Sequence, residues 1–279
     1  MKIGVSSYSF SKYMKATGAS YIDVCDKAKE LGFDGIEFIG LVDCDPIAMA
    51  KEIKAHCEKI GLPIIAYTVG ANFLADDIEA EMARVKSCVD VCEALGAPLM
   101  RHDVASKLRP IHMYSYEDAI NEMAPRIREI TEYAEMKGIR TCSENHGFIF
   151  QSPDRVEELI LAVGHKNYGW LCDMGNFLCV DVDPAEAVYI AAPYAFHVHA
   201  KDFIFKPGTE PMPAGYSIVT GNGNYLRGTV VGHGIVPVRQ CVNILKRAGY
   251  DAWLSLEFEG AEDNITALGN GLAFLRTCI

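Results

Sequence analysis

The sequence predicts an α/β fold of one domain (residues 1–279), a (β/α)8 TIM barrel with a long loop after its seventh strand, and three observations predict it. Short apolar runs alternate eight times with longer amphipathic runs, a pattern typical of parallel sheets. The 279 residues match the usual size of a single barrel domain. Residues 6–10, which follow the first apolar run, lack the glycine-rich phosphate turn that is typical of an open, doubly wound sheet.

The boundaries of the elements follow from capping and turn residues. Asp45 and Pro46 open one helix and Gly61 ends it, which is the usual asymmetry of helix ends. Ser115 is expected to cap another helix. The expected strands are 3–10, 34–39, 63–68, 98–104, 139–144, 170–173, 196–201 and 253–258. The expected helices are 21–31, 46–60, 76–95, 115–137, 152–163, 184–192, 237–248 and 263–276.

Alternation of side chains assigns the two faces of the strands. In the eighth strand Ser255 and Glu257 face the lumen if the apolar side chains face the helices. The fifth strand fits less cleanly, because an inward Glu144 sends Thr141 and Ser143 outward.

Residues 204–235 interrupt the regular alternation of strands and helices. They are rich in glycine and proline and separate the seventh strand from its helix. A segment of this length on the catalytic side of a barrel favours a lid or a substrate-binding hairpin. A hairpin turn is expected at Gly223 and Asn224, and Arg227 beyond it is a candidate substrate contact.

Composition narrows the range of partners and compartments. A net charge of -11 without any basic run argues against nucleic acid or an anionic membrane surface. No signal peptide and no membrane-spanning apolar run is recognisable. The 10 cysteines form no CxxC pair, which favours reduced thiols and a cytoplasmic location. The oligomeric state stays open, with a homo-oligomer as one option.

Polar side chains gather at the carboxyl ends of the expected strands, where barrel enzymes carry their active sites. In residues 196–202, His197, His199 and Lys201 share one strand face, and the first of them is expected to be structural. Taken singly, each polar residue is as well explained by a structural role. The full set is Glu37, His102, Glu144, His146, Asp173, Asn176, His197, His199, Lys201, Glu257 and Glu259.

Four members of this set come from strands five to eight, one from each: Glu144, Asp173, His199 and Glu257. Three carboxylates gathered in a barrel mouth repel one another unless a cation is present. Three oxygen donors and one imidazole suit Mn²⁺, with Mg²⁺, Co²⁺ or Fe²⁺ as alternatives and Zn²⁺ less favoured. Two coordination positions would remain for adjacent oxygens of a substrate.

Four segments together resemble the xylose isomerase-like superfamily of TIM barrels: SENHGF, LCDMGNF, FHVHAKDF and LSLEFEG. Within it the chain looks most like the sugar phosphate isomerases/epimerases, relatives of ketose 3-epimerases and inosose dehydratases. The resemblance implies that Glu144, Asp173, His199 and Glu257 hold the metal and that the two glutamates also move the substrate proton. Asn176 stands where a second histidine is common in that superfamily, which argues against the trinuclear zinc site of endonuclease IV relatives.

The expected activity is metal-assisted proton transfer next to a carbonyl of a sugar or polyol, through a metal-stabilised enediolate. Glu144 or His146 would remove the proton and Glu257 would return it. The remaining substrate contacts are expected from Glu37, His102, Asn176, Lys201 and Arg227. For His146 a hydrogen bond to substrate is an equal alternative, and Lys201 is as readily explained by an ion pair with Asp202 or another carboxylate.

Other activities remain open at this stage. The same site suits an inosose-type dehydratase, or the catalytic subunit of a C-glycoside-cleaving lyase that works with a small accessory subunit. A phosphodiester nuclease is disfavoured by the net charge, and a non-catalytic sugar-binding module leaves the ligand set unexplained.

Overall fold

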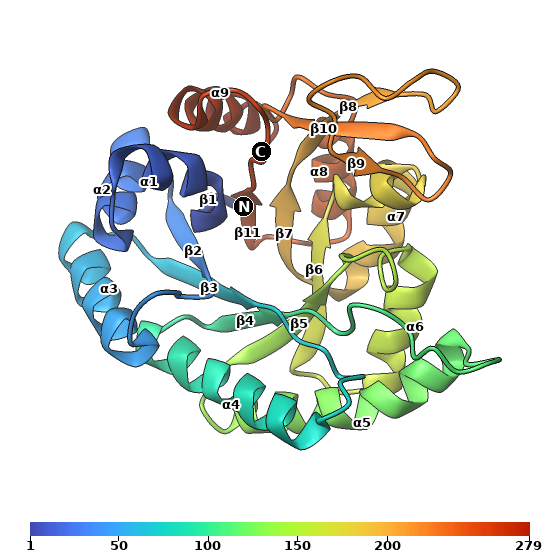
Figure 1. Cartoon of the computed structure of the whole chain (residues 1–279). Helices are drawn as coiled ribbons and strands as arrows, with labels where there is room; N and C mark the ends of the chain where they lie inside the picture. The colour runs from blue at the N-terminus through green and yellow to red at the C-terminus, as the bar shows by residue number, and fades with distance from the viewer.

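A computed structural model describes residues 1–279 and confirms the closed barrel. Eight parallel strands form one ring in the order β1, β11, β7, β6, β5, β4, β3, β2, and helices surround it (Figure 1). The ring closes where Ile3 of β1 pairs with Leu254 of β11. The barrel strands are β1 (Lys2–Ser6), β2 (Gly35–Ile39), β3 (Ile64–Val69), β4 (Leu99–His102), β5 (Arg140–Glu144), β6 (Tyr168–Asp173), β7 (Ala195–Ala200) and β11 (Trp253–Leu256).

The predicted capping residues Asp45, Gly61 and Ser115 lie at helix ends. The Asp45 carboxylate accepts hydrogen bonds from two N–H groups of the first turn of α3, and Gly61 ends that helix with a φ of 65°. Ser115 and Asp118 form a capping box on α5. The helices are α1 (Ser11–Thr17), α2 (Tyr21–Leu31), α3 (Pro46–Ile60), α4 (Ile78–Leu95), α5 (Tyr116–Glu135), α6 (Pro153–Val163), α7 (Pro184–Ala191), α8 (Val238–Arg247) and α9 (Asn264–Arg276). None of them combines the length and apolar character needed to cross a bilayer.

The first strand is shorter than predicted. It ends at Ser6, and the chain continues as a 3₁₀ helix (Ser7–Phe10) and then as α1, which the sequence analysis missed. Two serine hydroxyls explain the change. Ser7 Oγ accepts a hydrogen bond from the N–H of Ile39, and Ser9 Oγ accepts one from the N–H of Phe258. These side chains thereby satisfy backbone groups of neighbouring strand ends in place of an extended ladder.

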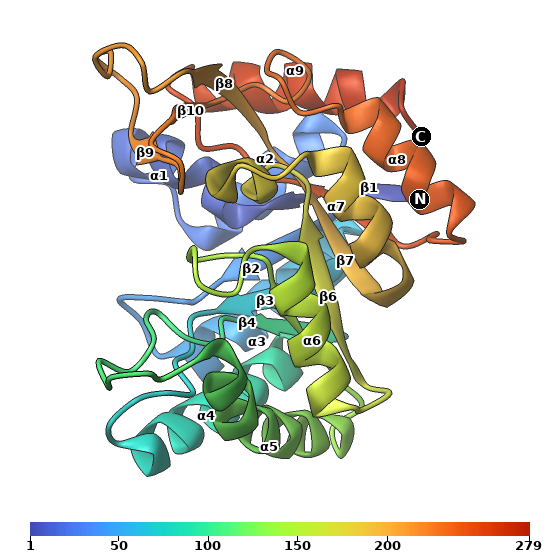
Figure 2. The same cartoon turned by 90° about the vertical axis from the view of Figure 1, so that its right-hand side faces the viewer.

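Segment 204–235 forms a second, smaller sheet instead of an irregular loop. Its antiparallel strands are β8 (Asp202–Lys206), β10 (Tyr225–Thr229) and β9 (Ile218–Val219), in that order across the sheet. The turn between β9 and β10 contains Gly223 with a φ of 84°, as the hairpin prediction requires. In Figure 2 this sheet lies at the upper left, where the barrel strands finish.

Inside the barrel, apolar packing lies beneath the polar residues of the strand ends, with Glu37 and His197 buried beside the apolar residues. Ala66, Leu99, Cys142 and Leu171 form an apolar layer inside the ring. The outward hydroxyls of β5 find partners behind the sheet, since Thr141 Oγ1 lies 2.8 Å from Thr131 Oγ1 and Ser143 Oγ lies 2.5 Å from the Tyr168 hydroxyl. Glu144 can therefore face inward without leaving its neighbours unsatisfied.

Candidate metal centre

The structure brings together the four side chains that the sequence predicted as metal ligands. They stand at the ends of β5, β6 and β7 and just after β11, and each offers one ligand atom within 4.8 Å of the others: Glu144, Asp173, His199 and Glu257. All four are buried or nearly so. Parallel strands bring them to one edge because their carboxyl ends meet there.

Distances and unsatisfied atoms indicate that the group fits a cation. His199 Nδ1 lies 3.6 Å from Glu257 Oε2, 3.7 Å from Asp173 Oδ2 and 3.9 Å from Glu144 Oε1. These separations are too long for hydrogen bonds. Two donors that each lie about 2.1 Å from one ion are roughly 3–3.5 Å apart, so a small contraction completes the site. His199 Nδ1 and Asp173 Oδ2 are also buried without any hydrogen-bond partner, a cost that a cation would remove.

Glu37 orients the imidazole of His199 by contacting its Nε2 atom. Its two carboxylate oxygens lie 2.6 Å from His197 Nε2 and 2.7 Å from His199 Nε2. The first contact is a hydrogen bond, whereas the second is a close electrostatic contact without hydrogen-bond geometry. Holding Nε2 in this way leaves His199 Nδ1 for a metal.

Glu37, which was predicted to contact substrate, is fully buried. Its side chain has no exposed surface, since the two histidines cover it. Burial raises the pKa of Glu37, but the two imidazoles outweigh this effect and hold the pKa well below its usual range. A register shift in the pairing of β2 with β3 falls between Ile36 and Glu37, and such irregularities commonly re-aim a side chain near a site.

Arg101 holds Glu144 from the β4 side, and the sequence analysis missed it. One guanidinium nitrogen, NH2, lies 2.7 Å from Glu144 Oε2 and 2.8 Å from Asp103 Oδ1. The signal that could have found it is alternation, because Arg101 shares the lumen face with Leu99. Burial lowers the pKa of Arg101, but the carboxylates outweigh this and raise it. The pKa of Glu144 is nevertheless raised, because burial exceeds the opposing effect of Arg101.

Asn176 and Lys201, both predicted to contact substrate, bind carboxylates of the candidate ligands. The amide of Asn176 donates a hydrogen bond of 2.8 Å to Glu144. Lys201 Nζ lies 2.6 Å from Glu257 Oε2 and 3.5 Å from Asp173 Oδ2. Of the two alternatives left open for Lys201, the structure therefore has the ion pair with a carboxylate.

The partner of Lys201 is Glu257 and not Asp202, whose carboxylate accepts hydrogen bonds from the N–H groups of residues 232, 234 and 236. Burial lowers the pKa of Lys201, but the surrounding carboxylates raise it well above its usual value. Burial raises the pKa of Glu257, but Lys201 and His199 bring it well below its usual value.

His102, which was predicted to contact substrate, lies apart from the four candidate ligands. Its ring lies outside the lumen, with the Phe73 ring centroid at 5.2 Å and the Tyr168 ring stacked at 6.0 Å. Because side chains alternate on a strand, an inward Arg101 forces His102 outward. Burial lowers the pKa of His102 to about 4, so it is a neutral core residue at neutral pH.

His146 and Arg227 lie outside the four-ligand group. The His146 side chain is 49% exposed, and its Nδ1 lies 3.0 Å from Asp103 Oδ1, the carboxylate that also binds Arg101. His146 therefore stands at the rim of the site. Arg227 lies on β10 of the small sheet, with its guanidinium 6.0 Å from the centroid of the Tyr216 ring and its Nε without a partner.

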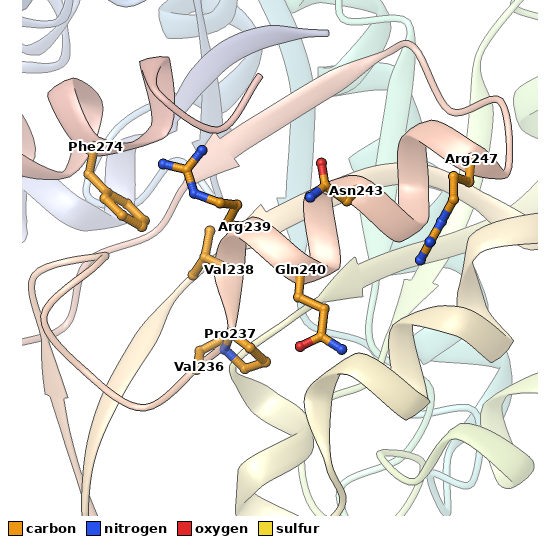
Figure 3. A pocket seen from close by; sticks show the side chains of 8 residues that line it. All are labelled: Val236, Pro237, Val238, Arg239, Gln240, Asn243, Arg247 and Phe274. Carbon is orange, nitrogen blue, oxygen red and sulfur yellow. The ribbon is translucent and has the colours of Figure 1, made fainter.

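Another cavity of the protein lies away from the metal centre. A cavity of about 590 Å³ lies on the outside of the barrel, where Figure 3 shows Arg239, Gln240 and Asn243 of α8 beside Phe274 of α9. No residue of the metal centre lines it.

Comparisons with known proteins agree with this architecture. Residues 25–278 match the family model of the xylose isomerase-like TIM barrel, so the chain belongs to that family. No curated protein sequence matches the chain.

Similar solved structures include three proteins of related fold. D-psicose 3-epimerase with D-tagatose from Clostridium cellulolyticum H10 is 18% identical, with a TM-score of 0.75 and coverage of 100% of this chain and 99% of that one. The probable 3-DHS dehydratase AsbF from Bacillus anthracis is 20% identical, with a TM-score of 0.74 and coverage of 99% of both chains. A xylose isomerase-like TIM barrel protein from Mycobacterium smegmatis in complex with magnesium is 18% identical, with a TM-score of 0.71 and coverage of 99% and 96%. At these identities the likeness establishes the fold.

Proposed function

We propose that this protein is a divalent-metal-dependent isomerase or epimerase that moves a proton next to the carbonyl of a sugar or related polyol. One observation carries the proposal. Four strand ends deliver Glu144, Asp173, His199 and Glu257 to one point, where two of their ligand atoms are buried without a hydrogen-bond partner. An epimerase and a magnesium-bound protein among the structures of the same fold support the reaction class and the metal. We expect Mn²⁺, given the oxygen-rich donor set.

A bound divalent ion would polarise the substrate carbonyl and offset the charge that develops on its oxygen. Glu257 would take or return the proton, because its carboxylate is kept ionised beside Lys201. Lys201 supplies a buried positive charge at the place where negative charge develops on the substrate. Arg101 and Asn176 hold Glu144, which would act as the second proton-transfer group.

Proton exchange in D₂O tests the proposal. The Mn²⁺-loaded protein is incubated with a panel of ketoses, and deuterium incorporation next to the carbonyl is followed by NMR. Glu257→Gln should lower the exchange rate by more than about 100-fold, the lower end of what a general base typically contributes. Metal content should remain within a few-fold of the wild type.

The matched control is Glu210→Gln, which alters an exposed carboxylate on the segment between β8 and β9. It should exchange at the wild-type rate. Full exchange activity in Glu257→Gln would remove the assigned role of that residue. No exchange with any ketose by the metal-loaded wild-type protein would remove the reaction class.

A dehydratase is the second candidate, and His146 is the observation that favours it. This imidazole stands at the rim beside Asp103, and no protein group bonds its Nε2. An imidazole in that place can protonate a departing hydroxyl. A dehydratase also occurs among the structures of the same fold. Release of water from a keto-polyol, detected as an unsaturated product, that is lost in His146→Asn while D₂O exchange persists would select this reaction.

A further inference from the structure

A second concave surface opens beside the metal centre, and neither the ligands nor Lys201 line it. This β2–β4 pocket has a volume of about 480 Å³ and lies at the carboxyl ends of β2, β3 and β4, against the start of α3 and one face of α4. Cavities of this size commonly hold drug-sized ligands. Most of its wall is apolar, formed by Ile39, Leu41, Val42, Tyr67, Val69 and Val91.

Arg101 joins the pocket to the metal centre. Its side chain lines the pocket, and its Nη2 atom lies 2.7 Å from Glu144. Arg101 therefore borders both the pocket and the metal centre. Thr68 also lines the pocket, next to Arg101 in the β3–β4 pairing. Arg101 Nε and Thr68 Oγ1 are buried and have no hydrogen-bond partner. The end of the pocket nearest the metal is therefore polar, whereas the rest of the wall is mainly apolar apart from Arg84 and Ser87.

The outer part of the pocket suits an apolar group and not a phosphate. Val42 stands at its rim and is 63% exposed. The one other cation of the wall, Arg84, is already engaged by the Glu81 carboxylate and by the carbonyl of Gly70. A phosphate would find no free positive charge there, while an aryl or alkyl group would be removed from water.

We propose that the β2–β4 pocket is a substrate subsite for an apolar substituent, so that the substrate is a sugar or polyol carrying an aryl or alkyl group. The inference rests on the proposed function for the position of the sugar itself. The sugar oxygens occupy the metal centre, the polar end of the pocket receives the linking oxygen, and the substituent lies between β2, β3 and α4. A free monosaccharide would leave this apolar wall in contact with water.

Calorimetric binding to the Mn²⁺-loaded full chain tests the subsite with four probes. These are 4-nitrophenol, 4-nitrophenyl β-D-glucopyranoside, D-glucose and D-glucose 6-phosphate. The aryl glucoside should bind at least tenfold more tightly than D-glucose, which corresponds to about 1.4 kcal/mol. 4-Nitrophenol alone should bind also to the metal-free protein, because the pocket uses no metal ligand.

Two variants locate the binding. Val42→Asp places a charge on the apolar rim at an exposed position that tolerates substitution, and Cys88→Phe fills the pocket from a half-buried position on α4. Both should remove the tenfold advantage of the aryl glucoside. The controls are Val219→Asp, at an exposed valine of β9, and Leu161→Phe, at an exposed leucine of α6, and both should keep it.

Several outcomes would overturn the subsite. They are equal affinity for aryl glucoside and glucose, tighter binding of the sugar phosphate, or an aryl advantage that survives both pocket variants. A change from dimer to monomer in Val42→Asp without any change in aryl binding would instead assign the surface to contact between copies of this chain. Aryl binding that maps to the pocket in a protein without proton exchange would overturn the proposed function and leave the subsite standing.

Discussion

The two halves of the barrel mouth carry buried charges for different purposes. Strands β5, β6, β7 and β11 supply the four candidate ligands, and two of the ligand atoms have no hydrogen-bond partner within the protein. Strands β2 and β4 supply Glu37 and Arg101, whose charged groups are turned onto the ligands His199 and Glu144. One half presents a group of side chains that could hold a cation, whereas the other half holds the first half in position. The β2–β4 pocket then adds a wall for substrate on the supporting side.

The largest effect is expected from a change in the ligand half. In Asp173→Asn the Oδ1 atom, which accepts hydrogen bonds from the N–H groups of Gly175 and Asn176, is preserved. The unpartnered Oδ2 is replaced by an amide nitrogen that cannot bind a metal. Affinity for Mn²⁺ should fall by more than about 100-fold, the upper end of what outer-shell changes cost.

Calorimetry and thermal unfolding measure this loss. The wild type at a metal concentration of 100 times Kd should gain about 2.7 kcal/mol, which corresponds to a Tm rise on the order of 5–10 °C. Asp173→Asn should show no such rise. Asp154→Asn, at an exposed carboxylate of α6, is the matched control. Wild-type affinity in Asp173→Asn would show that the four-ligand group is not the metal site.

A smaller effect is expected from the supporting half. Glu37→Gln keeps the shape of the side chain but removes its negative charge, so His199 loses the close electrostatic contact that orients it. Affinity for Mn²⁺ should fall by about 10–100-fold while all four ligands remain. The same calorimetric measurement detects this, with circular dichroism to verify the fold. An affinity equal to that of the wild type would contradict the division between a ligand half and a supporting half.

The ligand half could be predicted from the sequence, whereas the supporting half could not. Each ligand follows an apolar run at a strand end, and three clustered carboxylates repel one another unless a cation lies between them. On β4 the sequence analysis named His102 as a site residue, whereas Arg101 is the residue that contacts Glu144. Alternation sends only one of these two neighbours into the lumen, and a short strand gives little evidence for which one. Glu37 was placed in the lumen, but its depth depends on strand stagger and on a register shift that no local pattern reveals.

Fold prediction was limited in the same way by distant contacts. The eight barrel strands and their helices could be recognised because their periodicity is local. The small sheet depends on pairing between β8 and β10 and on the Asp202 carboxylate, which bonds backbone about 30 residues further along the chain. The end of β1 depends on serine contacts to β2 and to the residues after β11. Turn residues indicate where such a segment can bend but not what it will pair with.

The smallest effect is expected at His102, a residue of β4 whose side chain faces away from the lumen. A change there should alter the free energy of unfolding but not the affinity for Mn²⁺. The pKa of His102 is lowered to about 4 by burial, against about 6.5 in an unfolded chain. The unfolded state therefore binds an extra proton between these two values. The stability that neutral His102 contributes is fully present above about pH 6.5 and is lost as the pH falls toward 4.

Between pH 7 and pH 5 this loss should amount to about 1–2 kcal/mol of the free energy of unfolding, measured by urea denaturation of the metal-free protein. His102→Asn preserves a donor near the position of Nδ1, which bonds the carbonyl of Asp103, and removes the titrating ring. Its stability should therefore depend less on pH over this interval, although its stability at pH 7 is lower because the stacked ring is lost. His112→Asn, at an exposed histidine, should keep the pH dependence of the wild type.

Affinity for Mn²⁺ should stay at the wild-type level in both variants, because His102 touches none of the ligands. A loss of metal affinity in His102→Asn as large as that in Glu37→Gln would place His102 among the supporting residues and erase the distinction between the two faces of β4.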